Sequence, residues 1–282
     1  MTNESDRDDG RGSHRRGDNR RGGDVDRKRN SAASFGAAAD AYFESAVHGE
    51  GADLDHLAQW CDGATRVLDV ACGAGHTARA VARRGVSLDG ERVRSRVVAA
   101  DAAPEMVRTT IDAFGVPGIV ADAEQLPFSE HAFDAVTCRI AAHHFPNPTA
   151  FIDEVTRVLR PGGTFAFEDN VAPTDAELGS FLNRLERRRD PTHVESHPTR
   201  RWIEWLEAAG FDVRETVHLK KTIDFENWIE TQSLSKEERS AVEHLLLDAP
   251  PGARSLFEIR IEDGSVRSFA NLKALIRAVR ID

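Results

Sequence analysis

The fold of this chain is decided by the stretch Val67-Leu68-Asp69-Val70-Ala71-Cys72-Gly73-Ala74-Gly75-His76-Thr77-Ala78. It starts as a short apolar run with one acid, passes through two glycines and enters residues that favour a helix. Glycine is required where the backbone turns sharply and lets a ligand lie against it with no Cβ atom in the way. The stretch therefore predicts a strand, a ligand-binding loop and a helix in succession.

Short apolar runs rich in Val, Ala and Phe recur outward from this loop, and helical stretches separate most of them. Such alternation predicts a parallel sheet with helices on both faces. The expected fold class is therefore α/β, with a doubly wound, Rossmann-like sheet. The predicted strands are residues 66–71, 96–100, 118–121, 132–138 and 164–167.

The two ends of the chain differ from this centre. Residues 1–34 are rich in Gly, Arg and Asp and have almost no large apolar side chain, so we expect a disordered tail whose residues 1–30 are dispensable. Residues 35–282 are expected to form a single domain. Within it, residues 170–272 carry longer helical patterns, and we expect them to contribute lid and substrate-pocket elements.

Composition narrows the classes of partner. The chain has 282 residues, with 37 Lys and Arg against 47 Asp and Glu, a balance that does not attract a nucleic-acid backbone. No apolar run is long enough to span a membrane, and the charged N-terminus lacks the apolar centre of a secretion signal. Three widely spaced cysteines predict neither a disulfide framework nor a zinc site. We therefore expect a cytoplasmic protein without a membrane span.

Acids follow two further predicted strands, at the edge of the sheet where the glycine loop lies. Asp101 follows one strand and can accept both hydroxyls of a ribose. Asp122 and Ala123 follow the next, where a side-chain acceptor and a backbone N–H suit the edge of an adenine ring. A nucleoside is therefore the expected ligand of this edge.

With these motifs in order, the chain resembles the class I S-adenosylmethionine-dependent methyltransferases, in particular the branch similar to ubiquinone and menaquinone biosynthesis methyltransferases. The resemblance covers residues 35–169 well and the rest loosely. It implies a mostly parallel seven-stranded sheet with a terminal antiparallel hairpin, and a methyltransferase that uses S-adenosylmethionine. The implied cofactor-binding residues are Asp69, Gly73, Gly75, Asp101, Ala102, Met106, Asp122, Ala123 and Arg139.

The chain departs from the family pattern in two places. Ala71 stands where the family often has a glycine. Asp101 comes 32 positions after Asp69, and this gap includes an apparent insertion near residues 87–96 that we expect in a surface loop. A dinucleotide fingerprint has its acid after only about 20 positions.

Two alternatives to a methyltransferase remain at this point. One is an NAD(P)-dependent oxidoreductase, because residues 73–78 also satisfy the G-x-G-x-x-G/A pattern. That class places a pyrophosphate at the start of the helix, whereas Asp69 suits a ligand with a positive amino group. The other is a cofactor-binding, non-catalytic scaffold with the same fold.

The methyl acceptor is expected to be a small organic molecule. The sequence has neither the Asp/Asn-Pro-Pro-aromatic element of base-amine methylation after the fourth strand nor a Pro-Cys nucleophile, so nucleic acid is disfavoured. His143, next to His144, is the predicted general base, with a packing role for the pair as the alternative. The resemblance places Tyr42 and His48 in a segment that closes over the cofactor. Two adjacent histidines without a third ligand do not predict a metal site.

Overall fold

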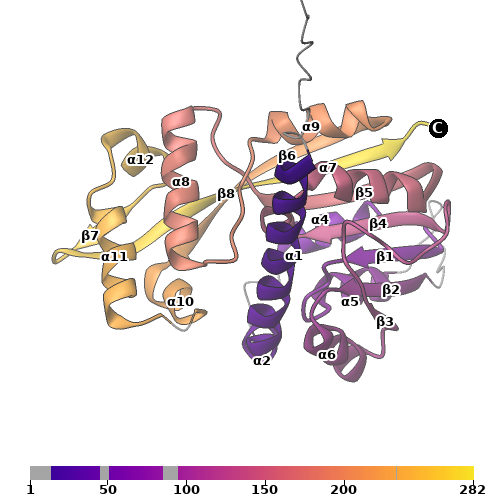
Figure 1. The fold of residues 1–282 in the computed structure, drawn as a ribbon, viewed down its shortest axis with the longest axis horizontal. Helices are drawn as coiled ribbons and strands as arrows, with labels where there is room; N and C mark the ends of the chain where they lie inside the picture. The colour runs from indigo at the N-terminus through magenta and orange to yellow at the C-terminus, as the bar shows by residue number, and fades with distance from the viewer. Residues whose placement is uncertain (1–13, 45–50, 85–94, 233) are drawn as a thin grey trace, which may run out of the picture.

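A sheet forms the centre of the molecule, in a computed structural model that describes residues 14–44, 51–84, 95–232 and 234–282 (Figure 1). Within these ranges the sheet has eight strands, of which seven follow the order β3-β2-β1-β4-β5-β8-β6 and β7 pairs with β8 beside them. Neighbours among β1 to β5 are parallel, and β8 is antiparallel to β5 and β6. The strands are β1 (Arg66–Val70), β2 (Arg96–Asp101), β3 (Gly118–Val120), β4 (Phe133–Arg139), β5 (Leu159–Asn170), β6 (Phe211–Asp224), β7 (Arg260–Glu262) and β8 (Ser265–Arg280).

The predicted α/β class and the mostly parallel sheet with a terminal antiparallel pair are confirmed. The short strand β7 was not predicted, because three residues are too few for an apolar period to be recognised. They pair with residues 265–268 at the start of β8 across a tight turn. The sheet therefore gains one strand beyond the expected seven.

Helices cover both faces of the sheet, as the nearly continuous apolar run of β1, buried on both faces, requires. Val67 packs with α4 (Ala52–Gln59) and α5 (His76–Arg84) on one face, and α6 (Pro104–Phe114) lies on β2 and β3. Leu68 and Val70 face α7 (Pro148–Val158) and α9 (Thr199–Ala208) on the other. None of the described helices is long and apolar enough to cross a membrane.

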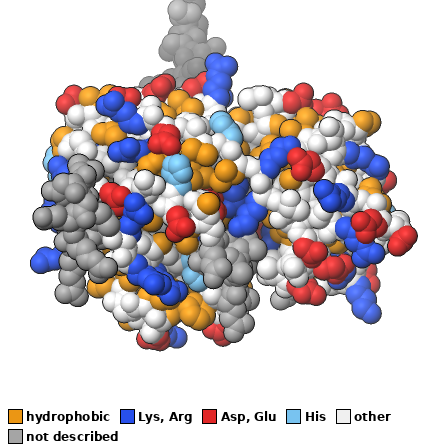
Figure 2. Space-filling model, turned by 180° about the vertical axis from the view of Figure 1, so that it is seen from behind, with side chains coloured by type: hydrophobic (Ala, Val, Ile, Leu, Met, Phe, Trp, Pro, Cys, Tyr) orange, Lys and Arg blue, Asp and Glu red, His pale blue; other side chains and the backbone are white. Residues whose placement is uncertain are grey.

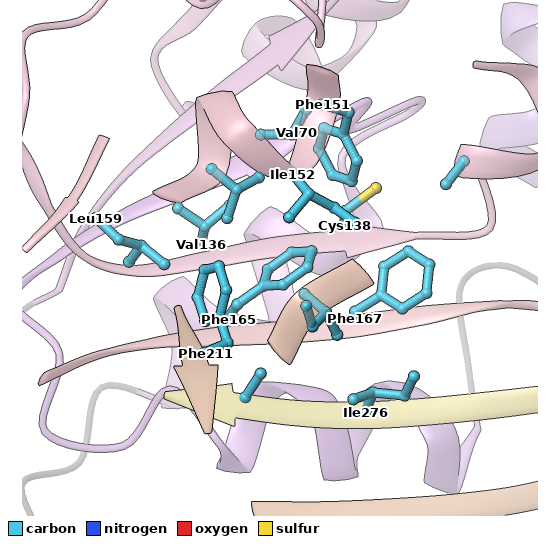
Figure 3. Close-up of a cluster of buried hydrophobic side chains, with 14 of the residues drawn as sticks. Val70, Val136, Cys138, Phe151, Ile152, Leu159, Phe165, Phe167, Phe211 and Ile276 are labelled. Atoms are coloured by element: carbon cyan, nitrogen blue, oxygen red, sulfur yellow. The ribbon is translucent and has the colours of Figure 1, made fainter. Parts of the chain in front are cut away.

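The larger core lies between β4, β5 and the helices α7 and α9 (Figure 3). Phe165 and Phe167 of β5 meet Phe151 of α7 and Trp202 of α9, and all four side chains are almost completely buried. Burying an aromatic side chain of this size stabilises a fold by about 1.5–3 kcal/mol. This core holds the parallel strands in register, so that their carboxyl ends meet at one edge.

The outer ends of β6 and β8 belong to a second lobe (Figure 1). Phe225, Trp228, Phe257 and Phe269 form its separate core. Because β6 and β8 are long enough to run through both lobes, the second lobe is an extension of the same sheet. Its helices are α8 (Ala176–Arg189), α10 (Phe225–Glu230), α11 (Lys236–Leu247) and α12 (Pro251–Leu256).

The N-terminal segment corrects one expectation. Residues 14–34, predicted to be disordered, lie in helix α1 (His14–Ala37), which α2 (Ala39–Glu44) follows. Ala32 and Phe35 of α1 pack with Met106 of α6, and Lys28 forms ion pairs with the loop after β3. These partners lie far away in the sequence, so the composition of the segment does not reveal them. The described residues do not include 1–13, 45–50 and 85–94. His48 and most of the predicted insertion near residues 87–96 therefore lie outside them.

Candidate functional site

A cavity of about 500 Å³ lies at the carboxyl ends of the parallel strands. Its walls come from α1, from the loop between β1 and α5, from the segments after β2 and β3, and from the segment that follows β4. In open α/β sheets this edge is where ligands bind. The topology therefore brings together residues that are spread over more than a hundred positions of the chain.

The glycine loop after β1 forms the floor of this cavity. Gly73 has φ 52°, in the left-handed region, and a Cβ atom there would meet no atom within 4 Å. The backbone at Gly73 is thus open to close approach by a ligand. Gly75, with φ 86°, has another role, because its Cβ would lie 2.6 Å from Thr110 Oγ1 of α6 and it does not line the cavity.

Two residues other than glycine in the cavity wall have left-handed backbones. Ala71, at the end of β1, has φ 51°, and Ile140, just after the neighbouring strand β4, has φ 55°. Such a conformation costs an L-residue about 1–2 kcal/mol and is unusual for a β-branched one. Ala71 is the position where the family often has glycine, so the departure seen in the sequence coincides with a strained residue.

Asp101 connects the glycine loop to the end of β2. One carboxylate oxygen accepts a hydrogen bond from the Gly73 N–H at 2.8 Å, and the other accepts from the Ala103 N–H at 2.9 Å. Burial raises the pKa of Asp101. A carboxylate has about four acceptor positions, so these two bonds leave capacity for a ligand in the cavity that Asp101 lines.

Asp122 and Glu124 hold α1 over the cavity. The Nζ atom of Lys28 lies 2.8 Å from Asp122 Oδ2 and 2.6 Å from Glu124 Oε2. Both acids line the cavity, as do Lys28 and Phe35 of α1. The helix is therefore one wall of the cavity, and only the tertiary structure reveals it.

Asp69 does not reach the cavity surface. Its carboxylate is buried, where it accepts hydrogen bonds from Thr137 Oγ1 at 2.6 Å and from the Ala78 N–H at 3.0 Å. Burial raises its pKa to about 7. In this structure Asp69 fastens the first turn of α5 to β1 and β4, and so supports the loop from behind.

Arg139, at the end of β4, lines the cavity and belongs to a buried ionic network. Its Nε atom donates to Glu168 Oε2 at 2.9 Å, and its Nη2 atom donates to Asp53 Oδ2 at 3.2 Å. Lys273 of β8 donates to the other oxygen of Glu168 at 2.8 Å. Burial alone would raise the pKa of Asp53, but Arg139 and Lys273 hold it well below its usual range. The network joins β4, β5, β8 and α4 beside the cavity.

The two adjacent histidines of η1 (Ala142–His144) have different environments. His143 is buried behind the cavity wall, where its Nδ1 lies 2.6 Å from Asp169 Oδ1 and its backbone N–H donates to Asp169 Oδ2. Burial alone would lower the pKa of His143, but Asp169, Glu186 and Asp190 raise it. His144, and not His143, lines the cavity. The predicted base is thus not the histidine that faces the open space.

The structure brings seven of the predicted cofactor-binding residues to the cavity wall: Gly73, Asp101, Ala102, Met106, Asp122, Ala123 and Arg139. Asp69, Gly75 and His143 are not in the wall. The side chain of Tyr42 lies outside the described part of the chain. None of the described residues in 170–272 lines the cavity, and their expected role as lid and substrate-pocket elements stays a prediction. Sequence reasoning missed Lys28 and Ile140, for which no local pattern gives a signal, and assigned no role to Glu124, which follows Asp122 and Ala123 directly.

The chain is similar to several known proteins. A family model described as a methyltransferase domain matches residues 68–167. The uncharacterized methyltransferase YcgJ of Bacillus subtilis is 31% identical over 255 residues, which are 87% of this chain and 97% of that protein. A solved structure from Bacillus halodurans C-125 is 35% identical with a TM-score of 0.76, and the match covers 82% of this chain and 100% of that one.

A more distant solved structure shares the fold alone. It is geranyl diphosphate C-methyltransferase from Streptomyces coelicolor A3(2), in complex with Mg²⁺, geranyl diphosphate and S-adenosyl-L-homocysteine. It is 15% identical, with a TM-score of 0.54, and the match covers 81% of this chain and 78% of that one.

Proposed function

Because the chain belongs to the class I S-adenosylmethionine-dependent methyltransferases, we propose that it transfers the methyl group of S-adenosylmethionine to a small organic acceptor in the cavity. One observation carries the proposal. The open backbone of Gly73 and the carboxylates of Asp101 and Asp122 lie in the wall of a single cavity at the carboxyl edge of the sheet. The NAD(P)-dependent oxidoreductase is set aside, because the chain belongs to another family.

The residues in the wall fit this cofactor. Asp101 keeps acceptor positions for the ribose hydroxyls while it holds the loop through the Gly73 N–H. Asp122 and Ala123 are assigned to the edge of the adenine, with Met106 and Ala102 as apolar wall. Gly73 leaves space for the methionine part to lie against the backbone. Asp69 supports the loop through Ala78 without touching the ligand.

The chemistry needs mainly positioning. When S-adenosylmethionine is bound, its sulfonium supplies a methyl group that is already activated. The protein has to hold the acceptor atom about 3–3.5 Å from that methyl carbon, opposite the sulfur, and to exclude water. Phe35, Ile140 and Phe145 provide an apolar wall suited to this task.

A small acceptor fits the size and charge of the site. The cavity of about 500 Å³ is in the usual range for small-molecule pockets. Acidic and basic side chains are interspersed on the face shown in Figure 2, and the chain has a net charge of −10. A nucleic-acid substrate would favour a continuous basic surface. The proposed acceptor is therefore a small molecule.

A labelled methyl donor tests the proposal. The protein is incubated with S-adenosylmethionine that carries a radioactive methyl group, once with a metabolite extract freed of macromolecules and once with the retained macromolecules. We expect label in a product of the first sample only. Label in the macromolecules would contradict the small acceptor, and binding of S-adenosylhomocysteine without transfer to any sample would favour the non-catalytic scaffold.

Composition predicts that residues 1–30 are dispensable, but the place of α1 in the cavity wall predicts that their deletion weakens cofactor binding. Deletion of residues 1–30 removes Lys28 and both of its ion pairs, so affinity for S-adenosylhomocysteine is expected to fall about two- to fivefold. Titration calorimetry measures the change. Lys28→Ala should reproduce part of the loss, whereas Arg27→Ala, at an exposed neighbour, should not. Full affinity of the deletion protein would show that residues 1–30, Lys28 included, contribute nothing to the site.

A further inference from the structure

The ring of His144 lies in the cavity wall, among the residues proposed to surround the acceptor. It packs edge-on against Phe35 of α1, with ring centroids 4.8 Å apart. Ile140 and Phe145, on either side of it in the sequence, also line the cavity. In the cavity wall, His144 is therefore a polar group beside the apolar side chains of Phe35, Ile140 and Phe145.

Hydrogen bonding determines which nitrogen of His144 carries its hydrogen. The Nδ1 atom lies 3.1 Å from the carbonyl oxygen of Thr192 and 3.2 Å from Thr192 Oγ1. The Thr192 hydroxyl gives its own hydrogen to Asp190 Oδ1 at 2.6 Å. Both neighbours of Nδ1 can therefore only accept, so Nδ1 is the donor. In the neutral ring the lone pair is then on Nε2.

The surroundings also keep the ring neutral. The ring of His143 lies 4.2 Å away, between centroids, and its charged form is stabilised by Asp169. Burial, and then the charge of His143, hold the pKa of His144 well below its usual range, although Asp190 and Asp169 oppose the shift. His193, on the segment after α8, also faces the pair. At neutral pH, His144 is thus a hydrogen-bond acceptor with a fixed tautomer.

We propose that Nε2 of His144 accepts a hydrogen bond from the nucleophile of the methyl acceptor, and that this nucleophile is a neutral hydroxyl group on a mainly apolar small molecule. The inference rests on the proposed function. An acceptor that arrived as a carboxylate or thiolate would meet the lone pair of Nε2 and be repelled. The apolar wall of Phe35 and Phe145 matches the rest of such a molecule.

The proposed step balances. A lone pair of the hydroxyl oxygen forms the bond to the methyl carbon, and the electrons of the broken carbon–sulfur bond stay on sulfur. The hydroxyl proton passes to Nε2 of His144 and is released to water when the product leaves. The protonated ether formed on the oxygen is a far stronger acid than the imidazolium of His144, so the transfer is favourable even to so weak a base. His144 acts late in the step, by accepting a proton that the new bond has made acidic.

The first test measures the tautomer in the wild-type protein. Nitrogen NMR on protein labelled with ¹⁵N-histidine and saturated with S-adenosylhomocysteine distinguishes protonated from unprotonated ring nitrogens, and a His144→Phe spectrum assigns the signals. We expect Nδ1 protonated and Nε2 unprotonated from pH 5 to pH 8. A hydrogen on Nε2, or a charged ring at pH 7, would overturn the proposal.

The second test measures acceptor recognition with phenol as the probe. In the complex with S-adenosylhomocysteine, saturation-transfer NMR is expected to show phenol bound more tightly than benzoate, and about fivefold or more weakened in His144→Phe. His218→Phe, at an exposed position of β6, is the matched control and should not differ from wild type. Equal phenol binding in His144→Phe, with S-adenosylhomocysteine still bound, refutes the role of His144. Failure of the wild type to bind S-adenosylhomocysteine would instead refute the proposed function.

Discussion

Asp101→Ala is expected to weaken binding of S-adenosylhomocysteine by about 1–3 kcal/mol, which is roughly a 5- to 150-fold rise in dissociation constant. Two effects add. The ribose hydroxyls lose their proposed acceptor, and the loop loses the bonds that Asp101 accepts from the Gly73 and Ala103 N–H groups. Without those bonds the left-handed turn at Gly73 is no longer held in its open position. Titration calorimetry measures the affinity directly.

Two further variants separate these effects. Asp101→Asn keeps one oxygen acceptor and should lose less affinity than Asp101→Ala. Asp112→Ala, at an exposed position of α6, removes the same charge away from the cavity and should leave the affinity unchanged. If Asp101→Ala binds S-adenosylhomocysteine as tightly as the wild type, the assignment of Asp101 to the ribose is wrong.

Arg139→Met is expected to lower the free energy of unfolding by roughly 3–5 kcal/mol. The methionine fills a similar volume but leaves Glu168 and Asp53, both buried, with Lys273 in contact and the charge of Lys221 nearby. Removing one partner of a buried ion pair is costly because the other charge stays out of water without full compensation. Urea denaturation followed by tryptophan fluorescence measures the loss.

The same variant has a predictable pH dependence. The pKa of Asp53 in the folded protein is depressed below 3.8, so its ion pairs contribute stability above that pH and lose it as the pH falls through the depressed value. The difference between wild type and Arg139→Met should therefore be full at neutral pH and narrow in strong acid. Arg160→Met is the control, since Arg160 pairs with Asp134 at the surface and its loss should cost at most about 1 kcal/mol. A neutral effect of Arg139→Met would show that the network adds nothing to stability.

Local patterns in the sequence were sufficient for the parallel strands of the sheet and for the floor of the site. Strand and helix periods in residues 66–167 depend on which side chains alternate, and that information is contiguous along the chain. The glycine loop and the acids Asp101 and Asp122 follow directly from it, because parallel strands bring their carboxyl ends to one edge. For this reason the fold class, the family and most of the cavity floor could be predicted before the structure was known.

The tertiary structure alone decided the remaining features of the site. Helix α1 forms a wall of the cavity because Lys28 pairs with Asp122 and Glu124, which lie 94 and 96 positions later in the chain. Asp69 points away from the cavity because Thr137 and Ala78 donate hydrogen bonds to its carboxylate. His143 and His144 are identical side chains in adjacent positions, yet one is bound to Asp169 and the other faces the open space. The surroundings of these side chains depend on contacts between residues far apart in the sequence. Because such contacts exist only after the chain has folded, no local pattern in the sequence contains them.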